Sequence, residues 1–375
     1  MIELRATPFH VRAAALNRSN GWIARNSATL AICYSDIADE ALAARARVAV
    51  ADISWRWRVA FEGPRASEFL SRLLTRDSAQ LVPGIAFKAL WLSDGGGVRG
   101  AGALARYGRE SFRLVSAASD SEWIRRAALQ FDVRTRDTTT EEGGLAIVGP
   151  CAKALLSGAG LEPDLERLAF RRQFWRGLDV TISRWGEHGG YELWCGADDC
   201  VALWDRIMRA GAPFGIQPVG LAAMDILDVE AGIARPWRDW QPAGDALAQA
   251  PTPASLSLES LIDESHNDFN ARAAWLNARA KETHKLVAIE LDSLTPAPHT
   301  LLTANGQPVG RTYSSFYSPS LRRAIALAQI ETAMLDVPLS LTVPATFEDP
   351  ALRTVMARVV KAPLLPPVEQ LAPRS

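Results

Sequence analysis

The chain has 375 residues, of which 48% are hydrophobic and 22% are charged, and its formal net charge is −1. This length suits two or three domains, and the charge balance excludes both the basic signature of nucleic-acid binding and the composition of disordered chains. The aromatic content is unusual, with 12 Trp against 5 Tyr. Such an excess indicates either core filling or aromatic walls around a flat or cationic ligand.

Cysteine spacing and hydropathy exclude further classes. Four cysteines in a chain of 375 residues make no disulfide framework. Cys195 and Cys200 lie five positions apart and the histidines are scattered, so no metal site is expected. The N-terminal segment lacks the apolar region of a signal peptide, and no apolar run reaches the roughly 18 residues of a membrane span. We therefore expect a cytoplasmic protein without membrane contact.

Short strands alternate with helices over residues 58–231. Apolar runs bounded by Gly, Pro or charged residues predict strands, and helical periodicity predicts helices. The strands are expected at 58–62, 87–92, 112–115, 145–148, 180–183 and 191–194. The helices are expected at 66–74, 122–129, 201–210 and 221–231. This mixture indicates an α+β or α/β fold.

One pattern occurs twice in this part of the chain. Gly63-Pro64 and Gly149-Pro150 each precede a helix, where proline suits the first turn because that position needs no N–H donor. Trp123 and Trp204 lie in later helices of the same order and are expected to be core residues. The offsets of 86 and 81 residues indicate two duplicated α+β modules.

The rest of the chain changes character. Residues 236–257 mix Trp, Pro and Ala without periodicity, which predicts a long connection. Asn305-Gly306 favours a type I′ hairpin turn, because that turn needs positive φ at both central positions. We expect a small barrel or meander, followed by a loosely held proline-rich tail from Pro363. Its strands are predicted at 286–291, 301–303, 307–312, 324–329 and 339–343.

The glycine-rich segment 95–100 matches the G-x-G-x-x-G pattern of dinucleotide-binding proteins, with Asp120 twenty residues further on. That interpretation requires a helix directly after the glycines. Gly102 and Gly108 interrupt the segment that follows, so a tight hairpin is the better interpretation. No G-x-S-x-G motif predicts a nucleophilic serine.

Several segments together resemble the glycine-cleavage T-protein superfamily, which includes aminomethyltransferases and tetrahydrofolate-dependent demethylases. The resemblance implies an α+β fold, a three-domain cloverleaf of two duplicated α+β modules and a C-terminal β-barrel-like domain, with folate entering a central opening. The similar segments, in the family's order, are Thr7-Pro-Phe-His10, Asp52-Ile-Ser54, 63–77, Pro83-Gly84, 95–97, 149–152, 183–192, 220–232 and 306–326.

The resemblance also implies the domain boundaries. A first, discontinuous folate-binding module is expected at 1–50 and 144–240, and a second α+β module at 51–143. Residues 241–283 would form a connection and residues 284–375 the C-terminal β domain.

The chain departs from the family pattern at functional positions. The resemblance places the family's catalytic carboxylate at Gly100-Ala101, a family histidine at Trp55, a pterin-facing tyrosine at Lys88 and an asparagine at Ser116. Aminomethyl transfer with release of ammonia needs a group that manages protons. The missing carboxylate therefore argues against glycine cleavage.

Glu192 matches the family's folate-binding glutamate, whereas two family arginines correspond to Met224 and Asp228. A carboxylate can accept two parallel hydrogen bonds from the amino-pyrimidine edge of a pterin. A structural glutamate in a strand is the competing interpretation. The cofactor-binding residues implied for tetrahydrofolate are Glu192, Ser116, Arg184, Trp185 and Asp225.

Methyl transfer to N5 of tetrahydrofolate is an in-line displacement that depends mainly on holding donor and acceptor in position. We therefore expect a tetrahydrofolate-dependent demethylase of a small O-, N- or S-methylated compound. A cationic donor would be stabilised by aromatic rings, and the substrate-binding residues expected for this are Trp55, Trp237 and Trp240.

An aryl methyl ether would instead require an acid for its leaving phenolate. The catalytic candidates for that role are Lys88, His188 and Tyr191. His188 lies in a glycine-rich turn, so a surface histidine is the competing interpretation.

Two other functions stay open. Because many pterin contacts of the family are lost, the chain also resembles a non-catalytic T-protein-like subunit. Such a subunit would dock on an oxidoreductase or another partner. It is also compatible with residual aminomethyl or formaldehyde-capturing transfer, which would release 5,10-methylenetetrahydrofolate instead of the methyl form.

Overall fold

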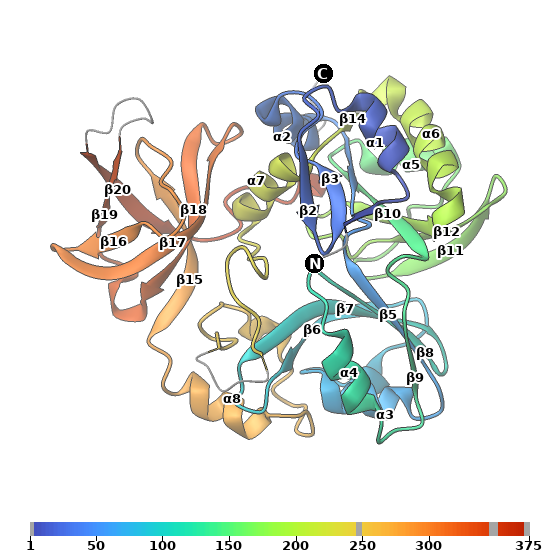
Figure 1. Ribbon diagram of the computed structural model, residues 1–375, viewed down its shortest axis with the longest axis horizontal. Coiled ribbons are helices and arrows are strands. Elements are labelled where there is room, and N and C mark those ends of the chain that lie inside the picture. Colours follow the sequence, from blue (N-terminus) through green and yellow to red (C-terminus); the bar gives the residue numbers. More distant parts are fainter. Residues whose placement is uncertain (1–3, 245–249, 345–351, 371–375) are drawn as a thin grey trace.

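The computed structural model describes residues 4–244, 250–344 and 352–370. Residues 245–249 of the expected connection, and residues 345–351 and 371–375 of the expected C-terminal domain, lie outside the described residues. The chain folds into three lobes arranged around the middle of the molecule (Figure 1). The several mixed sheets and the closed C-terminal barrel confirm the predicted fold class.

The first lobe is built from two separate parts of the chain. Its helices are α1 (His10–Leu16), α2 (Ile37–Ala46), α5 (Ala152–Ala159), α6 (Cys200–Gly211) and α7 (Leu221–Ala231). A small sheet contains β1 (Arg5–Ala6), β2 (Trp22–Arg25) and β3 (Ala28–Ala31). The main sheet has the order β11 (Phe170–Trp175), β12 (Leu178–Ser183), β13 (Tyr191–Gly196), β10 (Glu142–Val148), β4 (Ala49–Asp52) and β14 (Gln217–Pro218). Because β10 pairs with β4, the chain returns to the sheet that it left.

The second lobe occupies the stretch of chain between β4 and β10. Its five-stranded sheet has the order β6 (Ala86–Leu92), β7 (Val98–Gly108), β8 (Ser111–Ser116), β5 (Trp57–Glu62) and β9 (Arg134–Asp137). Two helices, α3 (Ala66–Leu73) and α4 (Ser121–Ala128), lie on the same side of this sheet (Figure 1). Phe69, Leu70 and Leu73 of α3 are buried in the core, where each contributes about 1.5–3 kcal/mol. The other face of the sheet is thereby left for the centre of the molecule.

The two lobes share the predicted strand–Gly-Pro–helix unit. β5 leads through Gly63 to α3, and β10 leads through Gly149 to α5. Both glycines have positive φ, +140° and +136°, and a Cβ atom would lie 2.6 Å from the Asp132 carbonyl oxygen and 2.4 Å from that of Arg47. Glycine is therefore required at both turns by backbone conformation and by close backbone approach.

The two tryptophans at equivalent places in the repeated units differ in burial. Trp204 is buried in the core of the first lobe. Trp123 is half-buried, and the Arg99 guanidinium lies 4.6 Å from its ring centre. Trp123 packs against the core of the second lobe without being fully enclosed by it, so the prediction that it is a core residue holds only in part.

The glycine-rich segment forms the predicted hairpin. The Ser93 amide donates to the Gly97 carbonyl oxygen at 2.8 Å, and Gly96 takes a φ of +82° in the turn. The strand β7 follows directly, so the helix required for dinucleotide binding is not there.

The third lobe is a closed barrel (Figure 1). Its strands, in barrel order, are β15 (His284–Leu291), β18 (Arg323–Glu331), β17 (Gln307–Ser318), β16 (Leu301–Ala304), β19 (Leu339–Pro344) and β20 (Leu352–Val360). Asn305 and Gly306 have φ values of 51° and 78° between β16 and β17, as the turn prediction requires. The connection before the barrel contains α8 (Arg272–Arg279).

The tail after the barrel is held against the first lobe. The Leu364 amide donates to the Glu230 carbonyl oxygen at 2.7 Å, and Val368 is buried beside α7. The prediction of a loosely held tail is therefore wrong for this part, because its backbone and side chains pack on α7. Within the described residues, no helix has the length and apolar character needed to cross a membrane.

Candidate functional site

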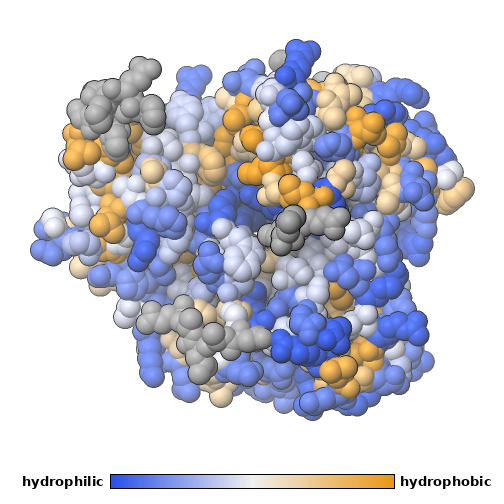
Figure 2. Space-filling view, viewed as in Figure 1, coloured by the Kyte–Doolittle hydropathy of each residue, from blue (hydrophilic) through white to orange (hydrophobic). Residues whose placement is uncertain are grey.

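A cavity of about 560 Å³ lies where the three lobes meet. Its volume is within the range of about 300–1,000 Å³ that is typical of ligand sites. Figure 2 shows a hollow near the centre of the molecule, between the lobes. We call this space the central cavity; its lining includes Lys88, Ala101, Ala103, Val115, Ser116, Trp185, Glu187, 231–236, Trp240 and barrel residues such as Leu286 and Leu327.

The sheet of the second lobe supplies one wall of the central cavity. Lys88 pairs with Ala103, and Ala103 pairs with Val115. Residues directly opposite each other in a sheet share a face, so Lys88 stands among small aliphatic side chains. Within the described part of the chain, the ammonium group of Lys88 has no hydrogen-bond or ion-pair partner. Burial lowers the pKa of its ammonium group, and the charge of Glu187 offsets only part of this effect.

The position that the resemblance assigns to a catalytic carboxylate is apolar. Ala101 presents a methyl group to the central cavity. Gly100 lies beside the buried ring of Trp91, and a Cβ atom at Gly100 would lie 2.1 Å from that ring. A side chain with a carboxylate therefore has no room at Gly100. At Ala101 the cavity wall has a methyl group in place of a carboxylate.

Glu187 supplies a carboxylate to the wall. Its Oε2 accepts a hydrogen bond from Arg56 Nη2 at 3.0 Å and lies 2.5 Å from Arg235 Nη2. Burial alone would raise the pKa of Glu187, but the charges of Arg235, Arg56 and Lys88 hold it well below its usual value. Glu187 is therefore ionised at neutral pH.

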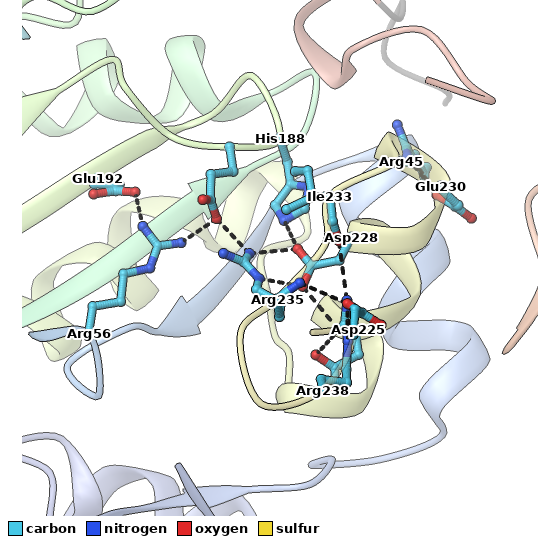
Figure 3. Close-up of polar contacts among 12 residues, drawn as sticks. Arg45, Arg56, His188, Glu192, Asp225, Asp228, Glu230, Ile233, Arg235 and Arg238 are labelled. Carbon is cyan, nitrogen blue, oxygen red and sulfur yellow. Dashed lines mark hydrogen bonds and ion pairs between the residues drawn. The ribbon is translucent and has the colours of Figure 1, made fainter. Parts of the chain in front are cut away.

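A second carboxylate anchors Arg235 from behind. Asp228 of α7 accepts two hydrogen bonds from Arg235, at 2.6 and 2.7 Å (Figure 3). His188 Nε2 lies 3.2 Å from Asp228 Oδ1. Burial would raise the pKa of Asp228, whereas Arg235, His188 and Arg238 lower it far more. His188 is buried, so its interpretation as a surface histidine is wrong.

Glu192 lies behind the cavity wall, with its carboxylate occupied by donors from the protein. Oε1 accepts from Arg56 Nη1 at 2.6 Å (Figure 3). Oε2 accepts from the indole nitrogens of Trp185 and Trp194 at 2.7 and 3.1 Å. The residue is fully buried. A carboxylate has about four acceptor positions, so three of them are used. Glu192 holds the cavity wall together instead of facing the cavity.

The structure brings only part of the predicted site together. The predicted residues that line the central cavity are Lys88, Ser116, Trp185 and Trp240. Glu192 contacts Arg56 and Trp185 of the cavity wall from behind. His188 contacts Asp228, which in turn binds Arg235 of the wall. Arg184 donates to the Leu165 carbonyl oxygen, away from the cavity.

Four other predicted residues also lie outside the central cavity. Tyr191 is buried in the core of the first lobe, and Trp237 is 62% exposed. Trp55 and Asp225 line a separate pocket of about 30 Å³. The Trp55 ring lies under the guanidinium groups of Arg25 and Arg56, at 5.3 and 5.9 Å, so the protein's own cations occupy its face.

Sequence reasoning missed Arg56, Glu187 and Arg235. Glu187 sits in the same glycine-rich turn as His188, and Arg56 follows Trp55 directly. The hydrogen bonds of Arg56 span 131 and 136 residues of sequence. No local pattern signals such pairs, because the partners meet only after the lobes have packed.

The fold and cavity define a class of protein with two α+β lobes and a barrel around a central ligand site. Residues 12–249 match the family model of the GCVT N-terminal domain, and residues 284–365 match that of the glycine cleavage T-protein C-terminal barrel domain. The chain belongs to the glycine-cleavage T-protein family, as its sequence predicts.

Named relatives agree with this assignment. The chain is 30% identical over 344 residues to an aminomethyltransferase of Frankia alni, covering 90% of this chain and 92% of that protein. It is 28% identical over 352 residues to a trimethylamine-oxide aldolase of Ruegeria pomeroyi, covering 89% of this chain and 44% of that protein. The glycine cleavage system aminomethyltransferase T of Bartonella henselae superposes with a TM-score of 0.86 at 23% identity, over 97% of this chain and 99% of that one, which shows the fold.

Proposed function

We propose that this chain is a folate-dependent one-carbon transferase that moves a methyl group from a small O-, N- or S-methylated compound to tetrahydrofolate. The observation that carries the proposal is Ala101, which faces the central cavity where the family pattern has a catalytic carboxylate. Methyl displacement depends mainly on positioning, and an apolar wall serves it well. The aminomethyltransferase relatives and the trimethylamine-oxide aldolase support one-carbon chemistry on a methylated nitrogen compound or related donor.

The residues of the central cavity fit a folate. Trp185 and Trp240 offer aromatic surface to a flat pterin, and the ionised Glu187 offers an acceptor for its N–H groups. When bound, tetrahydrofolate would supply N5 as the methyl acceptor. The cavity volume of about 560 Å³ leaves space for a small second ligand beside the pterin.

Lys88 is the group suited to the departing part of the donor. An O-methyl donor leaves an anionic oxygen, and the nearby ammonium of Lys88 would stabilise that charge and hold the proton at Nζ. The lowered pKa of Lys88 brings proton donation closer to neutral pH. A cationic donor leaves a neutral group and would not need this proton.

The test is product analysis with the full-length protein. Incubation with tetrahydrofolate and a panel of methylated compounds should yield 5-methyltetrahydrofolate with at least one donor. Release of 5,10-methylenetetrahydrofolate instead would identify aminomethyl or formaldehyde chemistry. Failure of the protein to bind any folate in calorimetry would contradict the proposal. Trp237→Ala is a matched control, since Trp237 is exposed and does not line the central cavity.

One observation favours a second function, a non-catalytic subunit of a larger complex. The carboxylate expected to bind the pterin, Glu192, is buried and bonded to Arg56, Trp185 and Trp194. A non-catalytic subunit would tolerate a glutamate that is not available to a pterin. Purification of this chain with a stoichiometric partner, together with no folate binding by the free chain, would support this alternative.

A further inference from the structure

Two glutamates lie near Trp185, and their accessibility differs. The Glu187 side chain is 23% exposed and lines the central cavity, whereas the Glu192 side chain is 1% exposed and does not. We propose that Glu187, not Glu192, is the carboxylate that accepts hydrogen bonds from the amino-pyrimidine edge of a pterin in the central cavity. This assignment rests on the proposed function.

The two carboxylate oxygens of Glu187 differ in their hydrogen-bond and ion-pair partners. Oε2 is shared by the guanidinium groups of Arg56 and Arg235. Oε1 has no hydrogen-bond or ion-pair partner among the residues that the structure describes. A carboxylate oxygen offers about two acceptor positions. Glu187 therefore has capacity on Oε1 for N–H donors of a ligand, whereas both oxygens of Glu192 already accept bonds and its side chain is closed off from the cavity.

The carboxylate of Glu187 is also fixed before any ligand arrives. Arg56 is anchored by Glu192 at 2.6 Å, and Arg235 is anchored by Asp228 at 2.6 and 2.7 Å. Arg56 comes from the start of the second lobe and Arg235 from the segment after α7, so two separate elements hold the same oxygen. A group held in this way loses little conformational freedom when it binds a ligand.

This arrangement gives Glu192 a different role. Through Arg56 it positions Glu187, and through its bonds to Trp185 and Trp194 it fixes one wall. Glu192 is thus a positioning residue, and Glu187 makes the contact with the pterin. Charge-assisted hydrogen bonds to a carboxylate are the stronger kind, so the contact should govern selectivity for the pterin 2-amino group.

Calorimetry with two ligands separates these roles. Folic acid and its 2-desamino-2-methyl analogue, which lacks the amino donor, are titrated into the full-length protein and into E187Q and E192Q. The unmodified protein should bind folic acid roughly 10- to 100-fold more tightly than the analogue. E187Q should lose this preference. E192Q should keep the preference, even though its overall affinity falls with the loosened wall.

Thermal unfolding of each variant shows that it is folded. E187D keeps the charge that Arg56 and Arg235 require but withdraws the carboxylate by one methylene, and it should also lose the preference, so it serves if E187Q does not fold. Loss of the preference in E192Q with retention in E187Q and E187D would overturn the assignment and leave the proposed function standing. An unchanged preference in every variant would overturn it too. Absence of folate binding to the unmodified protein would overturn the proposed function and the assignment together.

Discussion

Arg235 binds Asp228 through two hydrogen bonds, from Nε to Oδ2 at 2.7 Å and from Nη2 to Oδ1 at 2.6 Å. Both side chains are almost completely buried. The pair joins α7 to the segment that lines the central cavity, and it lies next to Glu187. The stability of the first lobe and the shape of the candidate site therefore depend on the same contact.

Removal of Asp228 should destabilise the protein strongly. Asp228→Ala leaves the buried Arg235 guanidinium without its main partner, at an expected cost of about 3–5 kcal/mol in the free energy of unfolding. The control is Asp205→Ala, which breaks a half-exposed pair with Arg12 and should change the free energy of unfolding far less, because solvent screens exposed pairs. Urea unfolding measures both. Equal effects of the two substitutions would contradict the importance of the buried pair.

Lys88 should matter for the reaction and not for the fold. Lys88→Met removes an ammonium that has no partner in the described residues, so the free energy of unfolding should stay the same or rise slightly. The rate of methyl transfer from an O-methyl donor should fall by about 10²–10⁴-fold if Lys88 supplies the proton. Lys153→Met, at an exposed lysine, should leave the rate unchanged. A large loss of stability in Lys88→Met would argue for a structural role.

Any side chain at position 100 should destabilise the protein. In Gly100→Ala the new methyl group would meet the buried Trp91 ring at 2.1 Å, which should cost about 1–3 kcal/mol of stability. Gly196→Ala is the matched control, because no atom lies within 4 Å of its Cβ position and its φ is −58°. Thermal unfolding should separate the two variants by several degrees. Similar melting temperatures would show that Trp91 yields easily, so that a carboxylate at this position is not excluded by packing.

Stability should decrease in acid because of Glu187 and Asp228. The pKa of each is lower in the folded protein than its ordinary value of 4.5 or 3.8. Groups of this kind bind more protons when unfolded, so their stabilisation is complete above those values and is lost as the pH falls below them. Urea unfolding between about pH 6 and 3 should show this decrease, and it should be shallower in E187Q. An equally steep decrease in E187Q would contradict the contribution of Glu187.

Substitution of Trp185 should lower folate affinity, whereas substitution of Trp237 should not. Trp185→Phe removes the indole N–H that Glu192 accepts and alters the cavity wall, so folate affinity should fall about 10-fold or more. Trp237→Phe changes an exposed ring and should leave the affinity unchanged. Calorimetry on both variants checks this difference. Equal losses would place Trp237 at the ligand, in disagreement with its exposure.

The local structure of this protein follows from its sequence. Periodicity placed α3 and α7 within a residue of their bounds, and Gly63-Pro64 and Gly149-Pro150 marked the repeated strand–helix unit. Asn305-Gly306 located a hairpin turn in the barrel. These signals work because backbone conformation and alternation of apolar residues are decided by near neighbours.

The arrangement of the candidate site was decided by tertiary structure. Sequence reasoning chose Glu192 as the pterin ligand and Trp55 as a substrate wall, but Arg56 bonds to the first and lies over the second. It missed Glu187, which becomes the exposed carboxylate only because Arg56 and Arg235 meet there from distant parts of the chain. A charged residue type shows that a side chain can bind a ligand. The sequence does not show which carboxylate is buried, which is already paired and which faces the cavity. These properties depend on Arg56, which lies more than 130 residues from both glutamates and reaches them only when the lobes pack.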